Sequence, residues 1–156
     1  REWQTHEPSY EDLVLKKDLS RDVQYFYSTT LFPQYAYPEW INGFEDSLLV
    51  PKLRKDGVPF LFVNRTVYRF NYGRGDHLTT HALYKRPRQF SRAYKEFITS
   101  HHSAMLHEPK RLLHFYLSIA KCEMLIGNRL VSLYWVMKCL EHPLSFTYYL
   151  RQKLFN

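Results

Sequence analysis

One short turn near the C-terminal end constrains the fold of this chain more than any other feature. Two apolar stretches, 110–126 and 129–141, are separated only by Gly127 and Asn128. Pro109 stands where a first helical turn tolerates proline, and Gly127 is a good helix C-cap. A connection this short forces two helices to run antiparallel. The sequence therefore predicts a C-terminal helical hairpin.

The hairpin also predicts the state of the two cysteines. Cys122 lies five residues before Gly127, and Cys139 lies twelve residues after it. At about 1.5 Å per residue, the two are roughly 10 Å apart along the helix axis. A disulfide needs Cα atoms within about 7 Å of each other. We therefore expect two buried, reduced thiols.

Helical patterns occupy three further stretches. Ser9, with an acidic residue at the third helical position, Asp12, is typical of a helix N-cap, and it predicts a helix over 10–27. Ser20 is an alternative, later start for this helix. A serine cap predicts a second helix over 91–106, and a short last helix carries residues 148–150.

The segment 32–60 has a different pattern, in which prolines alternate with aromatic residues. Proline removes backbone donors and blocks long helices, so we expect an extended segment. Its rings fit into another surface, either on the same domain or on a neighbouring chain. The residues predicted to dock in this way are Tyr35, Tyr37, Trp40 and Phe44.

A short β-hairpin is predicted after this segment. The stretches 60–63 and 67–70 are rich in β-branched and aromatic residues, with a turn at Asn64-Arg65. The following Gly73-Arg74-Gly75-Asp76 has the letters of an integrin-binding loop, but its two glycines are typical of a tight turn.

The predicted fold class is therefore mainly α. It is a small helical bundle with a C-terminal helical hairpin, a short β-hairpin and a long extended Pro/aromatic segment. Pro109 and Pro143 stand 34 residues apart, the period of tetratricopeptide-type repeats, but a solenoid needs about three repeats. The predicted parts are an acidic helical segment at 1–31, the docking segment at 32–60 and a basic, mostly helical body at 61–156.

Charge divides the chain unevenly. Residues 1–50 hold four basic and nine acidic residues, whereas residues 51–156 hold eighteen basic and six acidic ones. A basic body attracts polyanions. Nucleic acid, anionic lipid or an acidic protein surface would serve as partner, and a solvated basic face without a partner is the alternative.

The densest basic stretch is 85–95, with five positive charges and no negative one. Pro87 is expected to keep its first half extended as an arm, with a helix starting at Ser91. Arginine guanidinium groups match phosphates, and the rings of Phe90 or Tyr94 would stack on bases. The residues predicted to contact RNA or another anion are Arg74, Lys85, Arg86, Arg88, Arg92, Lys95, Lys110 and Arg111.

Catalytic and metal motifs are absent from the sequence. No nucleophile elbow or phosphate loop occurs, so no catalytic residue is assigned. His77 and His81, beside Asp76, have helical spacing but lack the glutamate of the metalloprotease signature. We therefore assign no metal site and no cofactor. No stretch reaches the roughly 18 apolar residues of a transmembrane helix.

These features together favour an accessory role. The start at Arg1 rather than Met and the pI of about 9.4 are similar to those of matured mitochondrial proteins. The first hypothesis is a supernumerary protein of the mitochondrial ribosome, in the matrix or on the matrix face of the inner membrane, contacting ribosomal RNA phosphates and neighbouring protein subunits. The alternatives are a soluble accessory subunit of a respiratory complex or ATP synthase, and a small enzyme or metal-binding protein.

Overall fold

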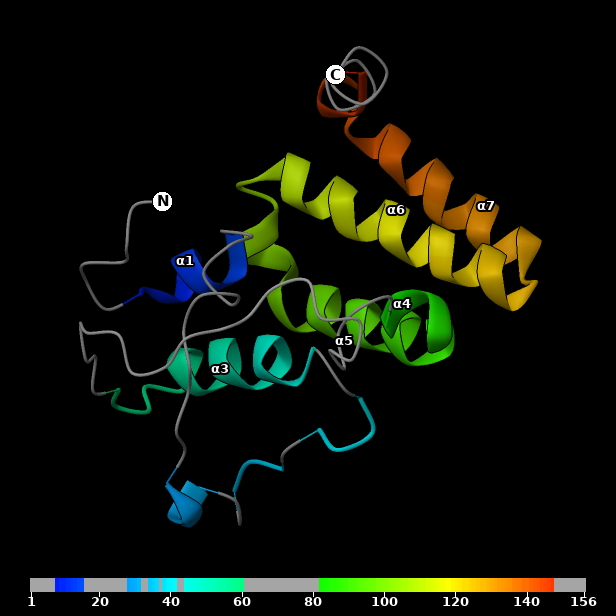
Figure 1. Cartoon of the computed structure of the whole chain (residues 1–156). Coiled ribbons are helices and arrows are strands. Elements are labelled where there is room, and N and C mark those ends of the chain that lie inside the picture. The colour runs from blue at the N-terminus through cyan, green and yellow to red at the C-terminus, as the bar shows by residue number, and fades with distance from the viewer. Residues whose placement is uncertain are drawn as a thin grey trace, which may run out of the picture. The chain divides into compact units, whose positions relative to one another are not determined.

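The computed structural model divides the chain into two compact units, Arg1–Thr80 and His81–Asn156, called here the N-terminal and C-terminal units. Every regular element in the described part of the chain is a helix (Figure 1), which confirms the mainly α class. The structure describes residues 8–15, 28–31, 34–36, 38–41, 44–60 and 82–147.

The first helix, α1 (Tyr10–Leu15), begins as the sequence predicts. The Ser9 hydroxyl accepts a hydrogen bond from the Asp12 backbone N–H at 3.0 Å. The Asp12 carboxylate in turn accepts the Ser9 backbone N–H at 3.0 Å. This reciprocal pair satisfies donors that a helix start leaves open. The rest of the predicted helix, 16–27, lies outside the described residues.

A second helix of the N-terminal unit overturns part of the prediction. The helix α3 (Glu45–Lys55) lies inside the segment expected to be extended, and it contains Pro51. An interior proline costs about 3 kcal/mol, but burying one leucine contributes about 1.5–3 kcal/mol. Leu49 and Leu53 are buried beside Tyr35, with Leu31 packed against this cluster. Apolar burial therefore outweighs the cost of the proline, and the extended prediction is wrong for 45–55.

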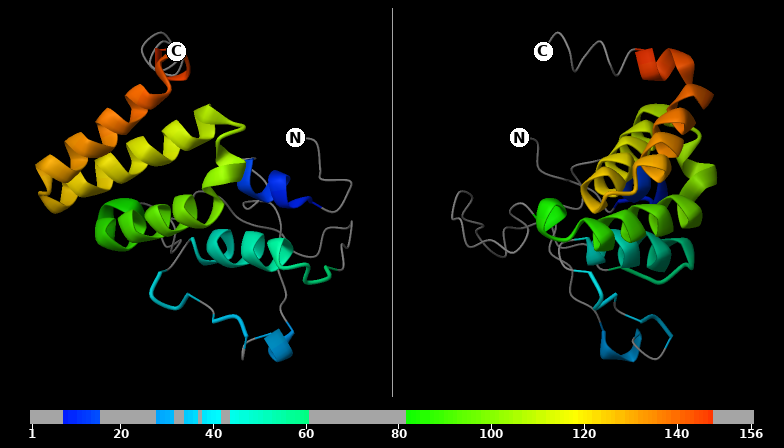
Figure 2. Two further views of the ribbon diagram at one scale, coloured as in Figure 1. Left: turned by 180° about the vertical axis from the view of Figure 1, so that it is seen from behind. Right: turned by 90° about the vertical axis from the view of Figure 1, so that its right-hand side faces the viewer.

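The C-terminal unit is built from three main helices. These are α5 (Pro87–Met105), α6 (Pro109–Ile126) and α7 (Arg129–Lys138), and α6 contacts both of the others. Figures 1 and 2 show α6 and α7 side by side, running in opposite directions. Two short elements complete the unit, the helix α4 (Ala82–Lys85) and the 3-10 turn η2 (Cys139–Glu141).

The predicted helical hairpin is confirmed. Gly127 ends α6 in the left-handed region, with φ 93°. A residue with a Cβ is strained at this φ, which explains why glycine stands here. Cys122 and Cys139 are both free and buried, as their axial separation predicts.

Aromatic rings between α5 and α6 form the centre of the C-terminal unit. Phe97 of α5 stacks on Phe115 of α6, with ring centroids 4.8 Å apart and planes 9° apart. Leu112, Leu113 and Ile119 of α6 are fully buried as well. Helix α6 is buried on several sides because it lies against both α5 and α7.

The start of α5 corrects a second prediction. The sequence suggested an extended arm before a helix beginning at Ser91, but α5 begins at Pro87 and Lys85 ends the helix α4. Proline fits the first helical position because the backbone N–H there has no intrahelical partner. The basic stretch is therefore helical almost throughout.

The β-hairpin prediction is not supported. The part of the chain that the structure describes contains no strand, and the predicted strands and turn, apart from Phe60, fall outside it. The glycine turn at 73–76 and the last helix at 148–150 fall outside it too. None of the described helices combines the length and the hydropathy that crossing a bilayer requires.

Candidate interaction surfaces

Four exposed cations follow one another on α4 and α5. Lys85 ends α4, Arg86 is the N-cap of α5, and Arg88 and Arg92 lie in its first turns. We call these four residues the basic ridge. Arg88 and Arg92 stand four residues apart on α5, so they share one face of that helix.

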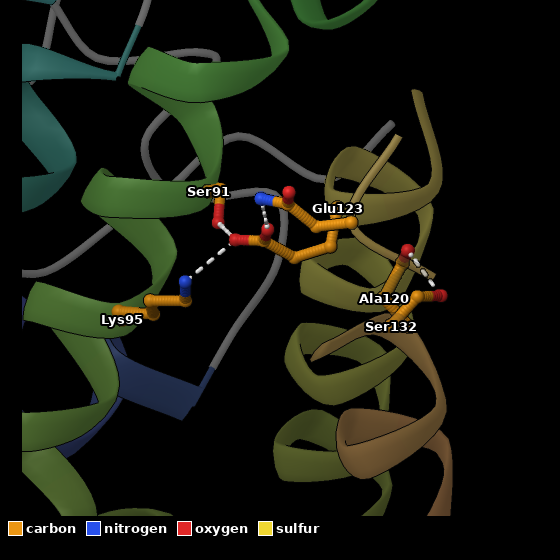
Figure 3. Close-up of polar contacts among 6 residues, drawn as sticks. Ser91, Lys95, Ala120, Glu123 and Ser132 are labelled. Carbon is orange, nitrogen blue, oxygen red and sulfur yellow. Dashed lines mark hydrogen bonds and ion pairs between the residues drawn. The ribbon is translucent and has the colours of Figure 1, made fainter. Parts of the chain in front are cut away.

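Lys95, predicted to belong with these cations, has a different role. Its Nζ lies 2.6 Å from Oε1 of Glu123 on α6 (Figure 3), and the Glu123 side chain is only 5% exposed. The Ser91 hydroxyl donates to the same oxygen at 2.5 Å. The side-chain amide of Asn128 donates to Oε2 at 2.8 Å. We call Ser91, Lys95, Glu123 and Asn128 the Glu123 network.

The chemistry of this network is structural. Burial raises the pKa of Glu123, but hydrogen bonds from Lys95, Ser91 and Asn128 lower it by more, so the pKa falls below its usual value. The ionised carboxylate pairs with the Lys95 side chain and accepts the hydrogen bond of the Ser91 hydroxyl. Neither group is arranged as a general base or a nucleophile. The network instead ties α5 to the turn between α6 and α7.

A concavity of about 620 Å³ lies beside the network. The carboxylate of Glu123 at its wall is covered by its three donors, whereas Arg88 and Arg92 on the rim are exposed. The exposed charges that line the concavity are therefore the two arginines and the carboxylate of Glu96. It is lined by Arg88, Ser91, Arg92, Lys95, Glu96, Thr99, Glu123, Ile126 and Asn128.

The remaining predicted cations do not join this surface. Lys110 and Arg111 stand at the start of α6, and thirteen residues separate Lys110 from Glu123. That is roughly 20 Å along the helix axis. The Arg111 guanidinium lies over the ring of Phe115, 4.9 Å from its centroid. Arg74 lies outside the described residues.

The aromatic residues predicted to dock on another surface differ in how far they are buried. Tyr35 is 5% exposed and packs with Leu49 and Leu53, so its ring belongs to its own unit. Trp40 and Phe44 are half-buried. Tyr37 lies outside the described residues, and docking by these last three residues stays a prediction.

An exposed apolar face of the hairpin was missed by the sequence reasoning, which did not say which sides of these helices are buried. Large apolar side chains point away from the body of the unit along α7 and beyond it. We call five of them the apolar stripe. Leu130 is 84% exposed, Leu133 57%, Met137 54%, Leu140 51% and Leu144 86%. The signal in the sequence is their spacing, which alternates between three and four residues.

The opposite side of α7 packs against α6. The buried Ser132 hydroxyl donates to the Ala120 carbonyl at 2.8 Å (Figure 3). The Trp135 ring lies 5.5 Å from that of Tyr116, and Cys139 is fully buried. At 100° per residue, this inward face is about 150° from the apolar stripe. The stripe is therefore the outward face of a helix that is already packed.

The two buried thiols give a testable prediction. Burial raises the pKa of both Cys122 and Cys139 to about 11, and only the thiolate reacts with iodoacetamide. In the native chain we expect slow alkylation at pH 8, with a rate that keeps rising towards pH 11. In urea the rate should follow the usual thiol pKa near 9. Rapid labelling of the folded chain at pH 8 would contradict the burial of these groups.

Metal binding finds no support among the described residues, where no group of three His, Cys, Asp or Glu side chains is close enough to hold an ion. His77, His81 and Asp76 lie outside that part of the chain.

Comparisons with known proteins do not identify a relative of this chain. Scans against protein-family models, curated proteins and solved structures each found no match for this chain. The basic ridge and the apolar stripe are therefore the features from which a function can be inferred.

Proposed function

We propose that this chain is a non-catalytic accessory subunit of a large assembly. The observation that carries the proposal is the apolar stripe, whose five large side chains are each more than half exposed. Extended apolar patches on a soluble surface mark sites of protein or membrane interaction. Burial against a neighbouring subunit removes this surface from water.

The more specific proposal is a supernumerary protein of the mitochondrial ribosome. It is supported by the basic ridge and by the charge of the C-terminal unit, whose described residues include ten basic and four acidic ones. Exposed arginines on a fixed helix suit the phosphates of ribosomal RNA, and such contacts position a protein without reading sequence. A place in the mitochondrial matrix belongs to the same proposal.

The experiment that tests this function is gradient sedimentation of the native particle that contains the chain. We expect co-migration with a large particle, and loss of that co-migration after ribonuclease treatment. Co-migration that survives ribonuclease but not detergent would replace the ribosome by a respiratory complex or ATP synthase. A free monomer under native conditions would overturn the accessory-subunit proposal itself.

A further inference from the structure

We infer that the apolar stripe of α7 binds one amphipathic helix of a partner protein, and that acidic residues flank the apolar seam of that helix. The inference rests on the proposed function, because it names the partner element for a chain that acts as a subunit. Three properties of the stripe carry it: its spacing, the surroundings of α7 and the charge of the unit.

The spacing of the stripe selects a helix as the occupant. From Leu130 to Leu140 its members follow one another at intervals of three, four and three residues, which is the a and d pattern of a heptad repeat. Side chains in this pattern form holes that accept side chains of a second helix. An extended strand presents its side chains at a period of two, and does not match this seam.

The seam is continuous over α7 and η2. From Leu130 to Leu140 it covers ten residue steps, roughly 15 Å along a helix. Beyond it, the backbone of His142 leaves the helical region, with φ −128° and ψ 64°. Leu144 therefore lies beyond the continuous seam, and we expect Leu130, Leu133, Met137 and Leu140 to contact the partner helix.

The surroundings of α7 disfavour a lipid surface. A helix that lies in a membrane interface carries many cations on the face opposite its apolar side. That face of α7 is packed against α6 through Ser132 and Trp135. The helix itself has two cations, Arg129 and Lys138, and Lys138 forms an ion pair with Glu141 at 2.6 Å.

The positive charge of the C-terminal unit favours a partner with acidic residues. The described residues of the C-terminal unit have an excess of six positive charges, ten basic residues against four acidic ones. Arg129, exposed at the start of α7, stands at a g position beside the stripe, where coiled coils place the charges that choose a partner. Pairing with a second copy would bring two basic units together, whereas acidic flanks on another protein complement them.

Site-specific photo-crosslinking in the native assembly tests the inference. Benzoylphenylalanine replaces Leu130, Leu133, Met137 or Leu140, one at a time, in the full chain, and mass spectrometry locates each crosslink. We expect crosslinks to one protein, at positions three or four residues apart in a segment with Asp or Glu beside the apolar positions. The control is the same replacement at Leu106, which is 46% exposed but lies outside the stripe, and it should not label that segment.

Other outcomes overturn the inference. These are crosslinks to lipid, to a second copy of this chain, to a segment with a spacing of two residues, or no labelling above the Leu106 control. Sedimentation of the same variants separates this failure from failure of the proposed function. If the variants still co-migrate with the particle but give no crosslinks spaced three or four residues apart, only the helix partner is refuted. If the wild-type chain migrates as a free monomer, both proposals are refuted.

Discussion

Replacing Glu123 by alanine is expected to lower the free energy of unfolding of the C-terminal unit by about 2–4 kcal/mol. The change removes the acceptor of three donors at once. Lys95 is 38% exposed and can turn towards water. Ser91 is buried, with 2% of the residue exposed, so its hydroxyl loses a charged acceptor and gains no solvent. The loss therefore comes from stranded polar groups rather than from lost apolar packing.

Thermal and urea unfolding followed by circular dichroism measure this effect. For a unit of this size, the melting temperature should fall by roughly 15 °C. The matched control is Glu96→Ala, which removes an exposed carboxylate from α5 beside the same concavity, and it should change stability by no more than about 0.5 kcal/mol. Equal losses from both changes would refute the structural role assigned to the Glu123 network.

Acid should reduce the contribution of Glu123. Its pKa is lowered in the folded chain from a usual value of 4.5, so the unfolded state binds the proton more readily. The stabilisation is therefore complete above the unfolded pKa and is lost as the pH falls through the folded pKa. The difference in stability between wild type and Glu123→Ala should shrink in that range. A difference that stays constant from pH 7 to pH 3 would contradict this account.

Elements with strong local signals could be predicted from the sequence. The N-cap at Ser9 and the hairpin turn at Gly127 depend on residues within a few positions of each other. Local rules also predicted that Cys122 and Cys139 do not form a disulfide, because two helices joined by a short turn have a fixed register. These predictions needed no knowledge of the surrounding structure.

The remaining elements depend on tertiary contacts. Pro51 argues locally against a helix, yet α3 forms because its leucines are buried. Pro87 is compatible with both an extended arm and a helix start, and the packing of α5 on α6 favours the helix. Apolar periodicity identified the hairpin helices but could not say which face of α7 meets α6 and which stays exposed. The role of Lys95 was hidden for the same reason, because Glu123 is 28 residues away.

Replacing Arg86, Arg88 and Arg92 together by alanine is expected to weaken RNA binding by about two orders of magnitude at 0.15 M salt. Each phosphate contact contributes about 0.9 to the slope of log K against log salt concentration. Three lost contacts therefore reduce the slope by about 2.7 on duplex RNA, and this electrostatic part alone gives roughly a 10²-fold change at that salt concentration. Fluorescence anisotropy with a labelled 20-base-pair RNA duplex, over a series of salt concentrations, measures both quantities.

A charge-matched control separates the ridge from general basicity. Replacing Lys52, Arg54 and Lys55 of α3 by alanine removes the same charge from the N-terminal unit. If net charge alone drives binding, both triple variants lose affinity equally and the ridge has no special role. If the basic ridge forms the phosphate contacts, only the ridge variant shows the full reduction in the slope of log K against log salt concentration. Lys95 should add little to that slope, since its ammonium already pairs with Glu123. The contrast between Lys95 and its exposed neighbours follows from the structure and not from the charge pattern of the sequence.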